Sequence, residues 1–225
     1  MHIGLIGGIG PAATDYYYRG LIERHAGSGT PLELTLVHAD VRELAQNLAN
    51  HDARQQADIF VRLVRRLAAA GAGAAAVTSM AGHFCIGELK AMSPLPILDA
   101  IPEVDAAIRD RNLKTIGILG TRTVMETGLY GGISSAEIVL PQGEVLEQIH
   151  TSYLEMAIAG RVTDAQRRVF FSIGQQLCRE QGAEAVMLGG TDLFLAFAGQ
   201  DCGFPVIDCA GIHVEALYRA SVAKA

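Results

Sequence analysis

The chain lacks long runs of one charge and long apolar segments. Its 225 residues carry 24 acidic and 18 basic side chains, a net charge of −6. Because nucleic-acid binding needs clustered Lys and Arg, this mixed pattern argues against nucleic acid as a partner. The longest apolar run, residues 72–80, is far shorter than the roughly 20 residues that span a bilayer. We therefore expect no membrane partner either.

Cysteines are few, widely scattered and without a CxxC pair: Cys85, Cys178, Cys202 and Cys209. A chain of this length needs no disulfide scaffold, and no zinc signature is present. The opening stretch, MHIGLIGGIGP, has no basic segment, and glycines break its apolar run, so it does not resemble a secretory signal peptide. We expect a cytoplasmic protein without a metal site.

The composition, 50% hydrophobic and 19% charged, is typical of a globular protein. Short β-rich runs alternate with longer amphipathic stretches, the pattern of a parallel sheet covered by helices. Strands are predicted at residues 2–6, 34–38, 73–78, 97–98, 115–119, 137–140, 185–188 and 206–207. Helices are predicted at residues 12–25, 41–50, 52–70, 82–92, 101–111, 122–132, 144–159, 164–181 and 211–224. Asp164 is a candidate helix N-cap, and Gly71 and Gly182 are candidate C-terminal glycines.

Two pairs of segments repeat in the same order along the chain. IGLIGGIGPAAT resembles IGILGTRTVMET, and AAGAGAAAVTSMAGHF resembles EQGAEAVMLGGTDLF. The repeat predicts an α/β fold of two similar lobes, residues 1–98 plus 206–225 and residues 99–205. Ligands of open parallel sheets bind beyond the carboxyl ends of the strands. We therefore expect the four glycine-rich or polar turns to face one cleft between the lobes.

The first of these turns, GGIGPAAT at residues 7–14, does not fit the dinucleotide fingerprint, which needs a third glycine. It is better interpreted as a turn that directs backbone N–H groups of a helix N-terminus toward a carboxylate. Pro11 suits the first helical turn. The alternative is a tight turn with a purely structural role.

The other turns also carry polar groups. For each group, a purely structural role is the alternative to a functional one. Thr121 and Thr123 can donate hydroxyls, whereas Arg122 is as readily an exposed helix residue as a carboxylate clamp. Asp192 can act as a base in a cleft or as an ordinary helix N-cap. His83 can donate to a substrate oxygen or serve only in packing.

At these residues the chain resembles the aspartate/glutamate racemase superfamily, which includes hydantoin racemases, maleate isomerases and relatives of arylmalonate decarboxylase. The resemblance rests on IGLIGGIGPAATDYYYRGL, ILGTRTVMETGLY, QIHTSYLEMAIAG and PVIDCAGIHVEA. It implies a two-lobed α/β enzyme that uses no cofactor, including no pyridoxal phosphate. The family's chemistry uses two cysteines, one to remove the α-proton and one to return a proton from the opposite face.

The resemblance also implies that both thiols are missing here. Alignment on His83 places Ser79 at the first cysteine, and GGTD places Gly190 at the second and Asp192 at a glutamate. A serine hydroxyl without an adjacent base is too weak to remove such a proton. The sequence therefore argues against a symmetric two-thiol racemase, and the missing side chain at Gly190 suggests an enlarged pocket.

Three functions remain open. The first, our main hypothesis, is an isomerase of the amino-acid racemase family with non-standard catalytic residues, acting on a small carboxylate-bearing molecule. The second is a lyase, decarboxylase or hydrolase that uses the same cleft, and the third is a non-catalytic binder of a small acid. The candidate catalytic residues are Ser79, His83 and Asp192, and the candidate binding residues are Ile9, Gly10, Pro11, Thr78, Ala81, Thr121, Thr123, Gly190 and Thr191. Family relatives imply a homodimer.

Overall fold

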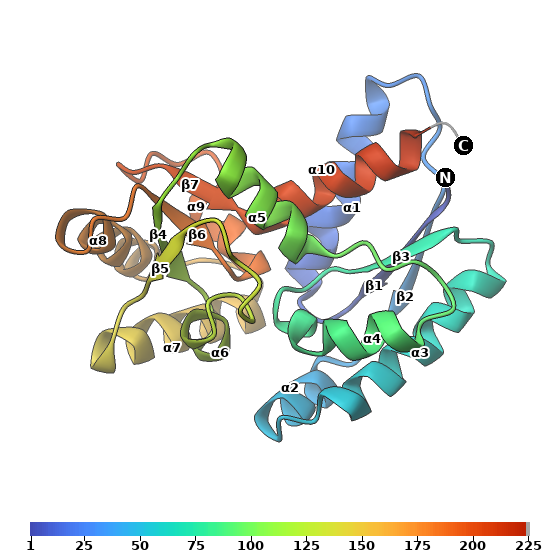
Figure 1. Ribbon diagram of the computed structural model, residues 1–225, viewed down its shortest axis with the longest axis horizontal. Helices are drawn as coiled ribbons and strands as arrows, with labels where there is room; N and C mark the ends of the chain where they lie inside the picture. Colours follow the sequence, from blue (N-terminus) through green and yellow to red (C-terminus); the bar gives the residue numbers. More distant parts are fainter. Residues whose placement is uncertain (224–225) are drawn as a thin grey trace. The chain divides into compact units, whose positions relative to one another are not determined.

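The computed structural model describes residues 1–223, which form two compact units (Figure 1). The first unit comprises Met1–Asp99 and the chain from His213 onward, and the second comprises Ala100–Ile212. Each unit contains its own parallel sheet flanked by helices, which confirms the predicted α/β class. Within residues 1–223, every helix is too short or too polar to cross a membrane.

The sheet of the first unit has the strand order β2-β1-β3. Its strands are β1 (Ile3–Gly7), β2 (Leu34–His38) and β3 (Ala74–Val77). All pairings are parallel, and Ile3 of β1 lies opposite both Leu34 and Ala74. The central strand β1 is buried along its whole length, whereas the edge strand β2 is partly exposed. A central parallel strand covered on both faces is expected to be uniformly apolar.

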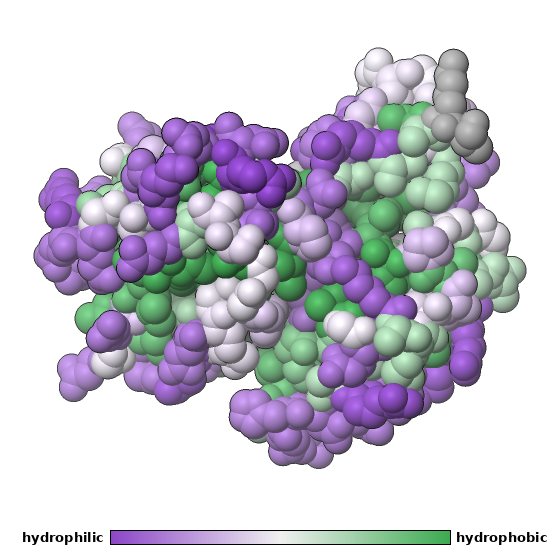
Figure 2. All heavy atoms as spheres, in the orientation of Figure 1, coloured by the Kyte–Doolittle hydropathy of each residue, from purple (hydrophilic) through white to green (hydrophobic). Residues whose placement is uncertain are grey.

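Helices cover both faces of this sheet: α1 (Pro11–Ala26), α2 (Val41–Ala49), α3 (Ala53–Ala69), α4 (Ile86–Met92) and α10 (Cys209–Val222). Figure 1 shows α2, α3 and α4 on one face and α1 with α10 on the other. Helix α3 buries an apolar face that includes Phe60, Val64 and Leu67. Its outer face, like that of α2, is mostly hydrophilic in Figure 2, as expected for helices that pack on one side only.

The sheet of the second unit has the order β5-β4-β6-β7, again all parallel. Its strands are β4 (Thr115–Leu119), β5 (Glu137–Val139), β6 (Ala185–Leu188) and β7 (Val206–Asp208). Its helices are α5 (Ala100–Asp110), α6 (Arg122–Glu126), α7 (Gly143–Ala159), α8 (Asp164–Glu180) and α9 (Phe194–Phe197). Of its two inner strands, β6 is fully buried.

Several predicted elements have the observed bounds, and others need correction. The strands at 34–38, 115–119 and 185–188 are confirmed residue for residue. The strand at 97–98 is reduced to a single bridge between Ala75 and Ile97. The N-cap of α8 is Thr163 rather than Asp164, because Thr163 forms a capping box with Gln166. The end of the last predicted helix, Lys224, lies outside the described residues.

Two predicted helices were too long. The helix at 122–132 ends at Glu126, because the four residues from Gly128 to Gly131 all have positive φ. The helix at 82–92 is divided into a short 3-10 helix, Ala81–Cys85, followed by α4.

The chain also returns to the first unit later than the sequence predicted. The prediction assigned residues 206–225 to the first lobe. In the structure, Val206–Asp208 pairs with β6 as the edge strand of the second sheet. The second unit therefore extends to Ile212, within α10.

One packing device occurs in both units: a glycine in the strand receives a leucine from the covering helix. A Cβ added at Gly4 of β1 would lie 2.8 Å from Leu67 Cδ1 and 3.1 Å from its Cβ. A Cβ added at Gly117 of β4 would lie 3.0 Å from Leu177 Cδ1 and 3.2 Å from its Cβ. Both leucines are buried. The missing Cβ thus allows α3 and α8 to approach their sheets closely.

We predict that Gly4→Ala and Gly117→Ala each lower the free energy of unfolding by about 1–3 kcal/mol, because the added methyl group overpacks the helix–sheet contact. Guanidinium unfolding measures the change. Gly87→Ala in α4 is the control, since no atom lies within 4 Å of its added Cβ and the helix gains propensity. Wild-type stability of the two strand variants would contradict the close-packing account.

Candidate active site

The turn after β1 is held by Thr14, a residue that sequence analysis did not select. The Gly8 amide donates to Thr14 Oγ1 at 3.0 Å, and that hydroxyl donates to the Gly10 carbonyl at 3.0 Å. Gly10 has φ 105° and precedes Pro11, the first residue of α1, as predicted. No side chain caps this helix N-terminus. Its backbone N–H groups are therefore not satisfied by a local side chain.

The turn after β3 lies against the turn after β1. The Thr78 hydroxyl donates to the Ile6 carbonyl at 3.1 Å and lies 3.3 Å from the Thr14 hydroxyl. A Cβ added at Gly82 would lie 3.3 Å from Ile9 Cδ1. The predicted site residues of the first unit lie in or directly after these two turns: Ile9, Gly10, Pro11, Thr78, Ser79, Ala81 and His83.

Ser79 and His83 are neighbours but do not form a nucleophile–base pair. Ser79 is 4% exposed, and its Oγ accepts a hydrogen bond from the Gly82 amide at 3.4 Å. His83 Nδ1–H donates to the carbonyl oxygen of Ser79, at 2.7 Å, rather than to its hydroxyl. Among residues 1–223, no basic side chain is hydrogen-bonded to the Ser79 hydroxyl. An unassisted serine is a weak nucleophile and a weaker base.

Burial keeps His83 and a second histidine, His213, neutral. Burial lowers the pKa of His83, and the Asp99 carboxylate, 3.9 Å from Nε2, opposes that shift. Burial, with a smaller effect from His83, lowers the pKa of His213 to about 3. His213 donates to the Leu98 carbonyl at 2.9 Å and accepts from the Tyr17 hydroxyl at 2.9 Å. These buried polar groups orient one another but are not cationic at neutral pH.

Sequence analysis missed Asp99, Tyr17 and His213. His213 lies in the segment PVIDCAGIHVEA, which was noted only for its resemblance. Asp99 gave no local signal, because its partners Lys90, at 2.5 Å, and His83 lie on other elements.

In the second unit, the turn after β4 lies against the turn after β6. A Cβ added at Gly120 would lie 3.3 Å from the amide nitrogen of Gly190. Thr121 caps α6, accepting from the Val124 amide at 3.4 Å, and Thr123 follows within that helix. Arg122 is exposed and pairs with Glu147 of α7, so its local role is a surface ion pair.

The space beside Gly190 is filled by an aromatic ring, which corrects the expectation of an enlarged pocket at this position. A Cβ added at Gly190 would lie 2.3 Å from Cε2 of Tyr153 and 2.9 Å from its hydroxyl oxygen. Real Cβ atoms do not approach other atoms so closely. Glycine is therefore needed at position 190 for Tyr153 to occupy this space.

Tyr153 also contacts Asp192, the predicted catalytic carboxylate. Its hydroxyl donates to Asp192 Oδ2 at 3.2 Å, and the two residues are 5% and 3% exposed. Burial raises the pKa of Tyr153 well above 10, and the charge of Asp192 raises it further. The 3-10 helix Thr191–Leu193 has Gly190 at its N-cap position, so Asp192 is not the N-cap considered from sequence.

Two of the four cysteines are unsuited to thiol chemistry. Cys85 and Cys209 are fully buried. Burial raises the pKa of Cys85 to about 12 and that of Cys209 well above its usual value. Because the thiolate is the reactive form, neither cysteine offers a base or nucleophile near neutral pH. Within residues 1–223, no three His, Cys, Asp or Glu side chains cluster to hold a metal ion.

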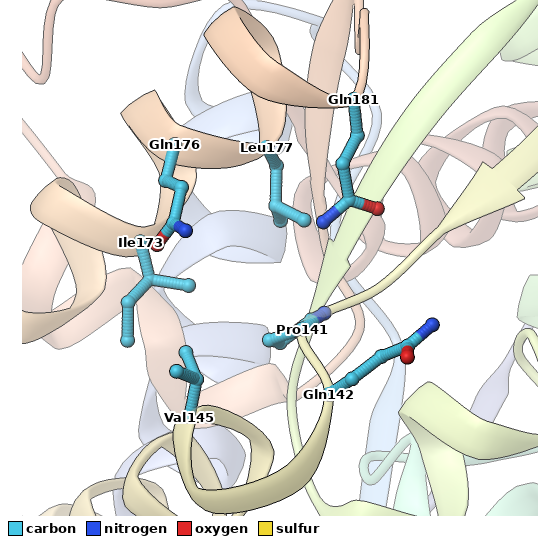
Figure 3. A pocket seen from close by; sticks show the side chains of 7 residues that line it. All are labelled: Pro141, Gln142, Val145, Ile173, Gln176, Leu177 and Gln181. Atoms are coloured by element: carbon cyan, nitrogen blue, oxygen red, sulfur yellow. The ribbon is translucent and has the colours of Figure 1, made fainter.

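A separate pocket of about 380 Å³ lies between the N-terminal end of α7 and α8 (Figure 3). Its wall combines glutamine amides with apolar side chains: Pro141, Gln142, Val145, Ile173, Gln176, Leu177 and Gln181. None of the predicted site residues lines it, so it is separate from the candidate active site.

The protein has two α/β units, each built on a parallel sheet with polar turns beyond its strands. This architecture defines its general class. The family model for Asp/Glu/Hydantoin racemase matches residues 6–217. The chain belongs to this family, as the sequence resemblance predicted.

Solved structures agree with this assignment. A Yersinia pestis protein assigned as an Asp/Glu racemase is 26% identical, with a TM-score of 0.85 over 99% of this chain and 100% of its own. An aspartate racemase homologue from Pyrococcus horikoshii is 25% identical, with a TM-score of 0.82 over 99% of each chain. Picrophilus torridus aspartate racemase shares the fold, with 17% identity and a TM-score of 0.76 over 98% of this chain and 94% of its own.

We predict that Gly190→Cys and Tyr153→Ala are energetically coupled. Alone, Gly190→Cys costs about 1–3 kcal/mol through its clash with the ring, and Tyr153→Ala costs about 3–5 kcal/mol through a cavity. Together they cost at least about 1 kcal/mol less than the sum, because the new side chain enters the vacated space. Guanidinium unfolding of all four proteins measures the coupling.

Gly87→Cys is the control for introducing an additional thiol, since its Cβ has open space around it. Strictly additive costs, or a Gly190→Cys protein as stable as wild type, would show that Tyr153 does not fill this position.

Proposed function

We propose that this chain is an isomerase-type enzyme that exchanges the α-proton of a small carboxylate-bearing molecule, without a cofactor and without a catalytic thiol. The observation that carries the proposal is Asp192, a buried carboxylate at the turn beyond β6. The family resemblance assigns this turn to the second thiol. A carboxylate held in a protein interior can act as a general base.

The first unit supports recognition of a carboxylate. The turn after β1 ends at the N-terminus of α1, a helix of 16 residues with no side-chain cap. The partial positive charge of such a terminus favours an anionic group. Thr78 of the neighbouring turn lies close to it, with its hydroxyl 3.3 Å from that of Thr14. A solved relative that is 25% identical is described as an aspartate racemase homologue, which supports an acidic amino acid or a related acid as the substrate class.

The proposal predicts that the purified protein incorporates deuterium at the α-carbon of at least one small acid in deuterium oxide. Proton NMR follows loss of the α-proton signal in a panel containing both enantiomers of aspartate, glutamate and neutral amino acids, with other small carboxylic acids. Chiral chromatography then determines whether exchange inverts the centre. Heat-denatured protein is the control.

Deuterium exchange into one acid at a rate above the control would show that the protein cleaves the α-C–H bond of that acid. This result would support an enzyme of this class. Ligand-induced shifts in the protein spectrum without exchange of any acid would contradict the proposal and favour a non-catalytic binder or chemistry away from the α-carbon.

A further inference from the structure

Tyr153 belongs to α7, yet its ring lies at the turn after β6, over the Cα of Gly190. The bare glycine and the ring occupy the volume that a side chain at position 190 would need. The ring also carries a hydroxyl to this position, with an oxygen that would lie 2.9 Å from a Cβ at residue 190. A group able to donate and accept a proton therefore stands where the family resemblance assigns a thiol.

The hydroxyl is hydrogen-bonded in the direction that proton transfer requires. It donates to Asp192 Oδ2 at 3.2 Å, and both side chains are almost completely buried. Burial and the nearby carboxylate raise the pKa of Tyr153, so the phenol remains protonated at neutral pH. Such a phenol can accept a proton only while it passes its own proton to a neighbour.

We propose that Tyr153 and Asp192 form a proton relay that replaces the second thiol. In one direction the α-C–H bond of the substrate breaks, and its proton forms a new O–H bond to Tyr153. The original Tyr153 O–H bond breaks in the same step, and that proton binds Asp192 Oδ2. The C–H electron pair stays on the α-carbon, so negative charge moves from Asp192 to the substrate carbanion.

The reverse transfer restores the α-C–H bond and the Asp192 carboxylate. Tyr153 remains neutral in both directions, which avoids a phenolate beside a buried carboxylate. The relay rests on the proposed function, since it needs a substrate with an exchangeable α-proton.

The test separates the hydroxyl from the ring. Tyr153→Phe keeps the ring that fills the space at Gly190 and removes only the relaying oxygen. Asp192→Asn keeps the shape of the side chain and removes the base. Tyr18→Phe is the control, because Tyr18 is 48% exposed on α1. For each protein, α-deuterium incorporation into the exchanged acid gives kcat and KM, and NMR titration gives the affinity for that acid.

We expect Tyr153→Phe and Asp192→Asn each to lower kcat for exchange by at least about 100-fold, the usual contribution of a general acid–base group. Their affinity for the acid and their melting temperatures should change little, and Tyr18→Phe should match wild type. A structural role alone would instead lower stability or affinity.

Two results would overturn the relay, and they have different consequences for the proposed function. Wild-type exchange that persists in Tyr153→Phe would overturn the relay and leave the proposed function standing. Absence of exchange in the wild type itself would overturn the proposed function and the relay together. If Tyr153→Phe does not fold, the Asp192→Asn variant is the deciding test. A folded Asp192→Asn protein with wild-type kcat would show that Asp192 is not the base and would overturn the relay.

Discussion

The close packing of the Tyr153 ring against Gly190 is the constraint on which the proposed chemistry of the second unit depends. A side chain at position 190 and a tyrosine at position 153 exclude each other, because their atoms would overlap. In the proposed function, the tyrosine therefore takes the place that the family resemblance assigns to the second thiol. The same ring position brings a phenol within hydrogen-bond distance of Asp192, so packing and chemistry are determined together.

The two units use one construction with different functional groups. In each, a glycine of an inner strand allows a leucine from the covering helix to pack closely, Leu67 on Gly4 and Leu177 on Gly117. In each, the turns after two neighbouring parallel strands lie in contact, which follows from their register. The first unit presents hydroxyls and a helix N-terminus there, and the second presents a carboxylate and a phenol.

The alternation of buried strands and amphipathic helices was readable because its signals are local. Three strands were predicted residue for residue. The polar turns could be recognised because their glycines and hydroxyl residues directly follow the predicted strands. The errors arose where the determinant was distant or conformational. The helix from Arg122 ends early because successive residues adopt positive φ, and β7 joins the second sheet through pairing with β6. Tyr153 was missed because it is 39 residues from Asp192, with no local pattern that indicates the contact.

The central claim is that the chemistry of this chain proceeds without thiols, and alkylation tests it most directly. The native protein is treated with iodoacetamide, the modified cysteines are identified by mass spectrometry, and α-deuterium incorporation is measured before and after. The account predicts an unchanged exchange rate, because Cys85 and Cys209 are buried with raised pKa values and take no part in the transfer. Loss of exchange in proportion to modification of either cysteine, with protection by the substrate, would contradict it.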